Sequence, residues 1–139
     1  MSEKPFRLAV RAVVLGDQRQ CLLLRRSVAN RSFVGTWEWP GGKVEDGESF
    51  DAGVCREVRE EAGLEIVLTG VAGAYQIETA ELHLVVLCME AKVASGVLRI
   101  SEEHDQSAWV PLSELSQWNL TAGFREFALG YAKRVTKGS

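Results

Sequence analysis

The chain has 139 residues, of which 46% are hydrophobic and 25% are charged, so a soluble globular protein with a single domain over residues 1–139 is expected. Its net charge is −3 and its sequence has no basic stripe, which argues against a protein that binds nucleic-acid polymers. No apolar run approaches the roughly 18 residues that a membrane helix needs, so no membrane partner is expected.

The first predicted elements are strands. Residues 6–15 are rich in β-branched side chains, and residues 21–26 form a second apolar run, so the pair is predicted to form a hairpin. Residues 27–36 are polar and irregular, which predicts a loop. Residues 37–42 then read as a short extended piece that ends with Pro40 and two glycines.

A helix is predicted between Ser49 and Gly63. The Ser49 hydroxyl can cap the N-terminus of this helix, and Gly63 can end it in a left-handed conformation. The expected apolar face consists of Val54, Val58 and Ala62, with Cys55 beside them.

Further strands are predicted at residues 65–78, 81–94 and 107–112, followed by a helix over about residues 121–135. Strands that flank a central helix, together with a terminal helix, predict an α/β sandwich on a mixed sheet.

The cysteines Cys21, Cys55 and Cys88 are widely spaced and form no C-x-x-C pair. Neither a zinc site nor a disulfide framework is therefore indicated, and reduced thiols are expected. The N-terminus also lacks a cleavable signal sequence, and these observations together predict a cytoplasmic protein.

An acidic stripe is predicted on the central helix. Because each helical residue advances ~100° around the axis, Glu57, Glu60 and Glu61 fall on one stripe beside the apolar face. Such a stripe is often only a solvated surface. In a cleft of effective dielectric ~20, however, two carboxylates ~6 Å apart repel by about 3 kcal/mol, so the groove would need a cation. Mg²⁺ is the natural candidate because it prefers oxygen ligands.

The spacing around the stripe favours the metal-binding interpretation. The stretch has Gly42, Glu48, Arg56-Glu57, Glu60-Glu61 and Gly63-Leu64 at intervals that resemble the Nudix box, G-x5-E-x7-R-E-U-x-E-E-x-G-U, where U is aliphatic. Every defined position of the box matches. The preceding segment, "WEWPGGKVEDGE", also resembles that of MutT-like members of the Nudix family.

This resemblance implies the Nudix α/β/α sandwich with a mixed β-sheet, and hydrolysis of nucleoside diphosphate derivatives with Mg²⁺ or Mn²⁺. It implies that Glu57, Glu60 and Glu61 hold metal or activate water through it, and that the Gly41 carbonyl is a further ligand. Arg56 lies next to the stripe, where it can pin a glutamate through a bidentate contact or form an ordinary surface ion pair.

Several residues outside the helix are candidates by the same resemblance. The loop with Glu102, Glu103 and Asp105 supplies another acid, and Glu103 best matches the metal-binding place in MutT-like relatives. Arg26 stands where such relatives have a substrate-contacting arginine, with Arg25 as the alternative because strand residues alternate between faces.

The remaining substrate candidates are less sharply defined. Lys43 is expected either to contact a phosphate of the substrate or to balance the negative charge of Glu45. Trp39 stacks on a base or belongs to the core. Asn119 lies near where MutT-like proteins read the base, and Ala122 competes for the same place.

The resulting hypothesis is a metal-dependent hydrolase that converts a nucleoside triphosphate, such as an oxidised guanine nucleotide, to the monophosphate and pyrophosphate. The alternatives are an ADP-ribose or nucleotide-sugar hydrolase and a nucleotide-sensing module without turnover. The expected partner is a small nucleotide, and the expected assembly is a monomer or a homodimer.

Overall fold

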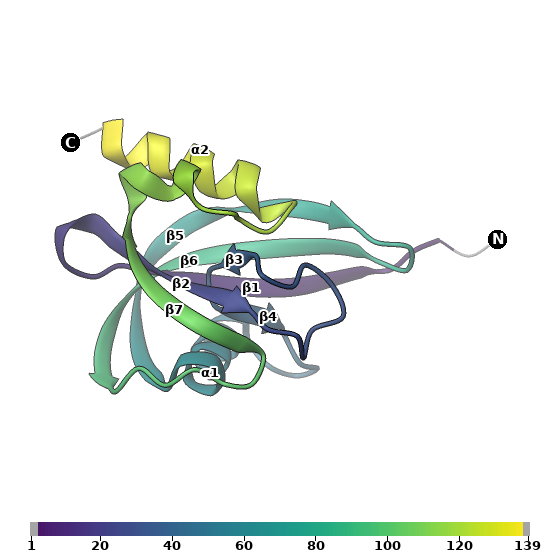
Figure 1. Cartoon of the computed structure of the whole chain (residues 1–139). Helices are drawn as coiled ribbons and strands as arrows, with labels where there is room; N and C mark the ends of the chain where they lie inside the picture. The colour runs from purple at the N-terminus through teal and green to yellow at the C-terminus, as the bar shows by residue number, and fades with distance from the viewer. Residues whose placement is uncertain (1–2, 138–139) are drawn as a thin grey trace.

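The structure is a computed structural model that describes residues 3–137 of the chain. Figure 1 shows three layers, in which helix α1 (Phe50–Ala62) lies on one side of the strands and helix α2 (Phe124–Lys137) lies on the other. This arrangement confirms the predicted α/β/α sandwich. Over the described residues no helix is long and apolar enough to cross a membrane.

The larger sheet has the strand order β4-β1-β6-β5. These strands are β4 (Gly41–Lys43), β1 (Phe6–Val14), β6 (His83–Gly96) and β5 (Leu64–Glu78). Strand β1 runs parallel to β6 and antiparallel to β4, and β5 and β6 form a long antiparallel hairpin, so the sheet is mixed as predicted.

The smaller sheet is antiparallel, with β2 (Gln20–Arg26) between β3 (Trp37–Glu38) and β7 (His104–Pro111). The predicted hairpin of residues 6–15 and 21–26 is wrong, because β1 and β2 belong to different sheets and share only the bridge between Leu15 and Cys21. Both strands are buried on both faces, and each therefore pairs with strands from elsewhere in the chain. Short 3₁₀ turns occur at Asp17–Arg19 and Leu112–Gln117.

The core has two halves because side chains of a strand alternate between its faces. From β1, Val10, Ala12 and Val14 pack with the half that contains the apolar face of α1. Ala9 and Val13 pack with the half that contains α2. Arg11 has the same parity as Ala9 and Val13, and its guanidinium lies 5.6 Å from the centre of the Phe124 ring of α2. A charged group is thus placed among apolar side chains on the α2 side.

Helix α1 begins and ends where the sequence predicts. The Ser49 hydroxyl accepts a hydrogen bond from the Ala52 amide, and Gly63 has the left-handed φ of 70°. Val54, Val58 and Ala62 are fully buried, which confirms the predicted apolar face. With that face against the sheet, Glu57, Glu60 and Glu61 of the helix line cavities near β4 and the loop before β7.

Candidate active site

Two neighbouring cavities lie where α1, β4 and the loop before β7 meet. The first, called here the glutamate pocket, has a volume of about 390 Å³ and is lined by Glu57, Glu60, Glu61, Ser101, Glu102 and Glu103. The second, called here the arginine pocket, has a volume of about 400 Å³, and its polar lining includes Arg11, Arg26, Lys43, Tyr75, His104 and Thr121. Glu61 and Glu103 line both cavities, so the two pockets share a wall.

The three glutamates of α1 differ in depth. Glu60 is exposed, the side chain of Glu57 is largely covered, and Glu61 is only 6% exposed. The Gly41 amide of β4 donates a hydrogen bond of 2.9 Å to Glu61 Oε1. Burial raises the pKa of Glu61 to about 9, against the lowering effect of this hydrogen bond, and the nearby Glu57 raises it further. Burial also raises the pKa of Glu57. The pocket therefore disfavours uncompensated negative charge and favours a cation.

Arg56 connects four acids at the edge of the glutamate pocket. Its guanidinium binds Glu48 through two contacts, Nε to Oε2 at 2.7 Å and Nη2 to Oε1 at 3.1 Å. Its Nη1 donates to Glu57 at 2.9 Å and to Glu60 at 3.0 Å, and it lies 3.4 Å from Glu45. The contact through two guanidinium nitrogens thus involves Glu48, whereas Glu57 and Glu60 are bound by Nη1 alone, which donates to both oxygens of Glu60 at 3.0 and 3.4 Å.

The donor set fits a hard divalent cation. Within residues 3–137 no three acidic, histidine or cysteine side chains are grouped as a ready-made metal cage. Glu57 and Glu60 are bound to Arg56, and Glu61 is bound to the Gly41 amide. The groups that line the cavity are nevertheless carboxylate oxygens, which Mg²⁺ and Mn²⁺ prefer. At position 42 a Cβ would lie 2.6 Å from the Glu57 carboxyl carbon, so any other residue there would displace this carboxylate from its present place.

A buried ionic cluster forms the polar wall of the arginine pocket, and Glu38 is at its centre. Glu38 is 4% exposed and accepts hydrogen bonds from Arg26 Nη1 at 3.2 and 3.3 Å and from Arg11 Nη2 at 3.4 Å. His104 Nε2 lies 3.1 Å from Glu38 Oε2, and the Thr121 hydroxyl donates to Oε1 at 3.4 Å. Burial alone would raise the pKa of Glu38, but Arg11, His104 and Arg26 hold it at about 2.

This cluster leaves an excess of positive charge. Two arginines face one ionised Glu38, and Lys43 lines the same pocket without an ion pair to any described residue. Two buried polar atoms, Tyr75 Oη and His104 Nδ1, also have no hydrogen-bond partner in the part of the chain that the structure describes. The side of the pocket formed by Arg11, Arg26 and Lys43 can therefore attract an anion and offer hydrogen-bonding groups to it, while the Glu61 and Glu103 carboxyl groups lie on the wall shared with the glutamate pocket.

The structure brings most of the predicted site residues to the two pockets. Gly41, Lys43 and Arg26 line the arginine pocket, whereas Arg25 pairs with Asp105 on the surface. A register shift between Arg25 and Arg26 in the pairing of β2 with β7 separates the two arginines. Glu103 lies on the wall between the pockets.

Two predicted substrate contacts are placed elsewhere. The Trp39 ring is fully buried and packs edge-on against Phe124 and Tyr131, as expected for a core residue and not for a base-stacking one. Asn119 is exposed and does not line the pocket, where Ala122 lies instead. The Asn119 carbonyl accepts a hydrogen bond from the Trp37 amide, so this residue connects β3 to the segment before α2.

The sequence hypothesis missed five residues of the arginine pocket: Arg11, Glu38, Tyr75, His104 and Thr121. A signal existed for the first two. Arg11 interrupts an apolar strand, and Glu38 stands between two tryptophans, and a charge in such a place is a signal of a buried partner that the hypothesis did not use. No local pattern marks the other three.

Two larger surface hollows, of about 640 and 650 Å³, lie around Leu15, Gly16 and Lys92 at a distance from α1. None of the box glutamates lines them. Because site chemistry depends on which groups converge and not on volume, the glutamate and arginine pockets are the candidate active site.

Comparison with known proteins agrees with this geometry. The family model described as NUDIX domain matches residues 5–129, so the chain belongs to the NUDIX family. It is a Nudix hydrolase, an enzyme of the class that acts on nucleoside diphosphate derivatives and nucleoside triphosphates.

Individual relatives are similar over most of their length. The chain is 34% identical to a MutT-like protein of Streptomyces ambofaciens, over 79% of this chain and 67% of that protein. It is 30% identical to the nucleoside triphosphatase NudI of Salmonella heidelberg, over 76% of this chain and 83% of NudI.

Solved structures show the same fold. The MutT protein from Methanosarcina mazei Go1 superposes with a TM-score of 0.85 at 34% identity, covering 97% of this chain and 99% of that one. The E. coli ORF135 protein gives a TM-score of 0.81 at 26% identity, covering 98% and 96%.

Proposed function

We propose that this protein hydrolyses a nucleoside triphosphate to a nucleoside monophosphate and pyrophosphate, with Mg²⁺ or Mn²⁺ as its cofactor. One observation carries the proposal: the glutamate pocket and the arginine pocket share a wall made by Glu61 and Glu103. A ligand that spans both pockets would have its nucleoside and part of its anionic chain in the arginine pocket, with the rest of that chain near the glutamates. The similarity to a nucleoside triphosphatase supports a triphosphate.

The proposed metal ligands are the carboxylates of Glu57, Glu60, Glu61 and Glu103 and the carbonyl of Gly41. When bound there, a divalent ion would offset phosphate charge and lower the pKa of a water molecule. Arg56 keeps Glu57 and Glu60 oriented through its hydrogen bonds to both. The Gly41 amide holds Glu61 through the hydrogen bond to Oε1.

Cationic side chains are proposed to bind the anionic part of the substrate. Arg11 and Arg26 are fixed by Glu38, so their positive charge is already in place before a ligand enters. Lys43 extends from β4 at the edge of the same pocket and can stabilise charge on the leaving pyrophosphate. Substrates with an oxidised guanine base belong to the proposed class, and an ADP-ribose or nucleotide-sugar substrate is the alternative that the product analysis below tests.

We further propose that the enzyme acts in the cytoplasm, as a monomer or a homodimer, on free nucleotides. Cys21, Cys55 and Cys88 are all unpaired, which suits a reducing compartment. The net charge of −3 makes a nucleic-acid polymer a poor partner.

The products identify the bond that is broken. Incubation with a panel of nucleoside triphosphates, oxidised dGTP and ADP-ribose should yield monophosphate and pyrophosphate from at least one triphosphate, because Lys43 and the arginines can stabilise the charge that develops on pyrophosphate. Chromatography with and without added pyrophosphatase measures both products. Orthophosphate formed without added pyrophosphatase would reject the assignment. Cleavage of ADP-ribose alone would favour the nucleotide-sugar class, and binding without turnover would indicate a sensor.

Activity should require a divalent ion. The glutamate pocket holds acids whose pKa values burial raises, and a cation is the partner that lets them carry charge together. We expect excess chelator to abolish turnover, and added Mg²⁺ or Mn²⁺ to restore it. Full turnover in chelator, with the metal content checked by elemental analysis, would contradict the proposed metal site.

A further inference from the structure

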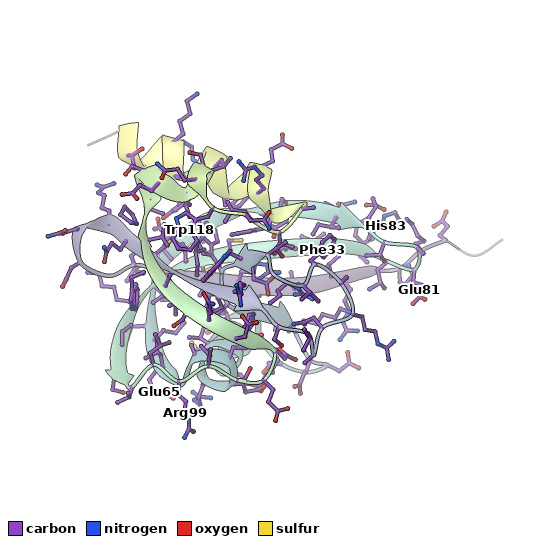
Figure 2. All side chains as sticks on the ribbon, in the orientation of Figure 1. Phe33, Glu65, Glu81, His83, Arg99 and Trp118 are labelled. Carbon is purple, nitrogen blue, oxygen red and sulfur yellow. The ribbon has the colours of Figure 1, made fainter. Side chains whose placement is uncertain are left out.

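Phe33 is an exposed aromatic residue at the arginine pocket. It lies on the loop that joins β2 to β3, where Figure 2 labels it, and its side chain lines the pocket although the residue is 51% exposed. Among the described residues its ring has no aromatic or cation–π partner, whereas the exposed ring of Phe6 stacks on His83 at 4.6 Å between centroids. The Phe33 residue is therefore half exposed at the pocket, and within residues 3–137 its ring has no aromatic or cationic partner that a ligand would have to displace.

The backbone holds Phe33 in an unusual conformation. Its φ of 57° lies in the left-handed region, which bulky residues rarely adopt. The Phe33 carbonyl accepts hydrogen bonds from the Thr36 amide at 3.1 Å and from the Thr36 hydroxyl at 2.7 Å. The Thr36 hydroxyl also lies 2.7 Å from the Thr121 hydroxyl, and Arg26 Nε donates to the Ser32 carbonyl at 3.0 Å. The loop is thus attached to two residues of the arginine pocket, and these contacts fix Phe33 at its edge.

The pocket has an apolar part as well as a cationic one. Ala9, Ile77 and Leu84, from the three long strands of the larger sheet, line it together with Phe33. A ligand that fills both parts must combine an anionic group with a flat, apolar-faced ring. A nucleobase attached to a polyphosphate has this combination, and an inorganic polyphosphate lacks the ring.

We propose that Phe33 stacks on the nucleobase of the substrate and that the base lies against the apolar wall formed by Ala9, Ile77 and Leu84. Phe33 is then a specificity-determining residue that separates nucleotides from other polyphosphates. The inference rests on the proposed function, because it takes a nucleoside polyphosphate as the ligand. An aromatic ring stacks on any base, so Phe33 selects the presence of a base and leaves the choice among bases to other residues.

The test compares a ligand that has a base with one that has none. Isothermal titration calorimetry with the α,β-methylene analogues of ATP, GTP, CTP and UTP, and with inorganic tripolyphosphate, gives Kd values for each protein. Phe33→Ala should raise the Kd of the tightest analogue about tenfold and leave that of tripolyphosphate unchanged. Phe33→Tyr, which keeps an aromatic ring, should retain wild-type affinity. Val34→Ala is the matched control, because Val34 is an exposed neighbour that does not line the pocket.

Kinetics and stability separate stacking from a structural role. In turnover assays Phe33→Ala should raise KM and leave kcat unchanged. Phe33→Gly should raise KM equally without lowering Tm, because glycine adopts the positive φ without strain. The inference would be overturned if the wild-type protein bound no nucleotide analogue more tightly than tripolyphosphate. It would also be overturned if Phe33→Ala lost affinity equally for both kinds of ligand, or lost affinity for neither. Failure of the proposed function would be recognised differently. The wild-type protein would then form no monophosphate and pyrophosphate from any nucleoside triphosphate, whatever the ratio of the Kd values for the analogues and tripolyphosphate.

Discussion

Glu61→Gln is expected to lower kcat for nucleoside triphosphate hydrolysis by about 10²- to 10⁴-fold while the protein remains folded. The glutamine has the shape of the glutamate, and its oxygen can still accept the hydrogen bond that the Gly41 amide donates at 2.9 Å. What the substitution removes is the ionisable oxygen on the wall between the two pockets. Because Glu61 is 6% exposed and burial raises its pKa to about 9, a neutral group should be accommodated there without loss of stability.

Steady-state kinetics measures the expected loss of kcat, and a thermal melt followed by circular dichroism measures the stability of the variant. Glu60→Gln should lower kcat in the same way, although Glu60 lies in a more exposed position. Glu65→Gln is the control, because Glu65 pairs with Arg59 on the surface of the α1 side and lines neither pocket (Figure 2). Near-normal turnover of Glu61→Gln with an unchanged melt would mean that the Glu61 carboxylate takes no part in hydrolysis.

Local signals in the sequence were sufficient for α1 and its site residues. The cap at Ser49, the end at Gly63 and the apolar face depend on residues within the same segment, so spacing alone predicts them. Helical periodicity also places Glu57, Glu60 and Glu61 on one stripe. It does not predict that Glu61 is the buried one, because that burial depends on β4 and on the segment around Ser101, whose amide donates to the Glu61 carbonyl.

Long-range pairing was the part that the sequence did not reveal. Two neighbouring apolar runs predicted a hairpin, but β1 takes β6 and β4 as partners, and β2 takes β3 and β7. Strand β7 begins at His104, three residues before the predicted start. The prediction began too late because the first residues of this strand are polar, and they pair with Arg25 and Arg26 of β2. Their pairing is visible only when the partner strand is known.

The ionic cluster of the arginine pocket illustrates the same limit. Arg11, Glu38 and His104 come from three strands in two sheets, and no spacing in the sequence connects them. Their charges are compensated only in the folded protein, where Glu38 meets Arg11 and Arg26. The cluster therefore couples the position of the cationic groups to the stability of the fold, and the effect of removing its central charge can be predicted.

Glu38→Gln is expected to lower the free energy of unfolding at pH 7 by about 3 kcal/mol, because it leaves two mostly buried arginines without their carboxylate. Glu38 has a pKa of about 2 in the folded protein, below its ordinary value of 4.5. The stabilisation by Glu38 is therefore complete above about pH 4.5 and is lost as the pH falls toward 2. The difference between wild type and variant should accordingly be largest at neutral pH and should narrow at pH 3.

Urea denaturation at pH 7, 5 and 3 measures this difference. Asp105→Asn is the matched control, since it removes the carboxylate from an exposed pair with Arg25 and should cost under about 1 kcal/mol. Equal stabilities of wild type and Glu38→Gln at pH 7 would mean that solvent compensates the arginines as well as Glu38 does. A difference that stays constant from pH 7 to pH 3 would mean that the loss comes from packing, because a lost packing contact, unlike a lost charge, does not depend on the protonation of Glu38.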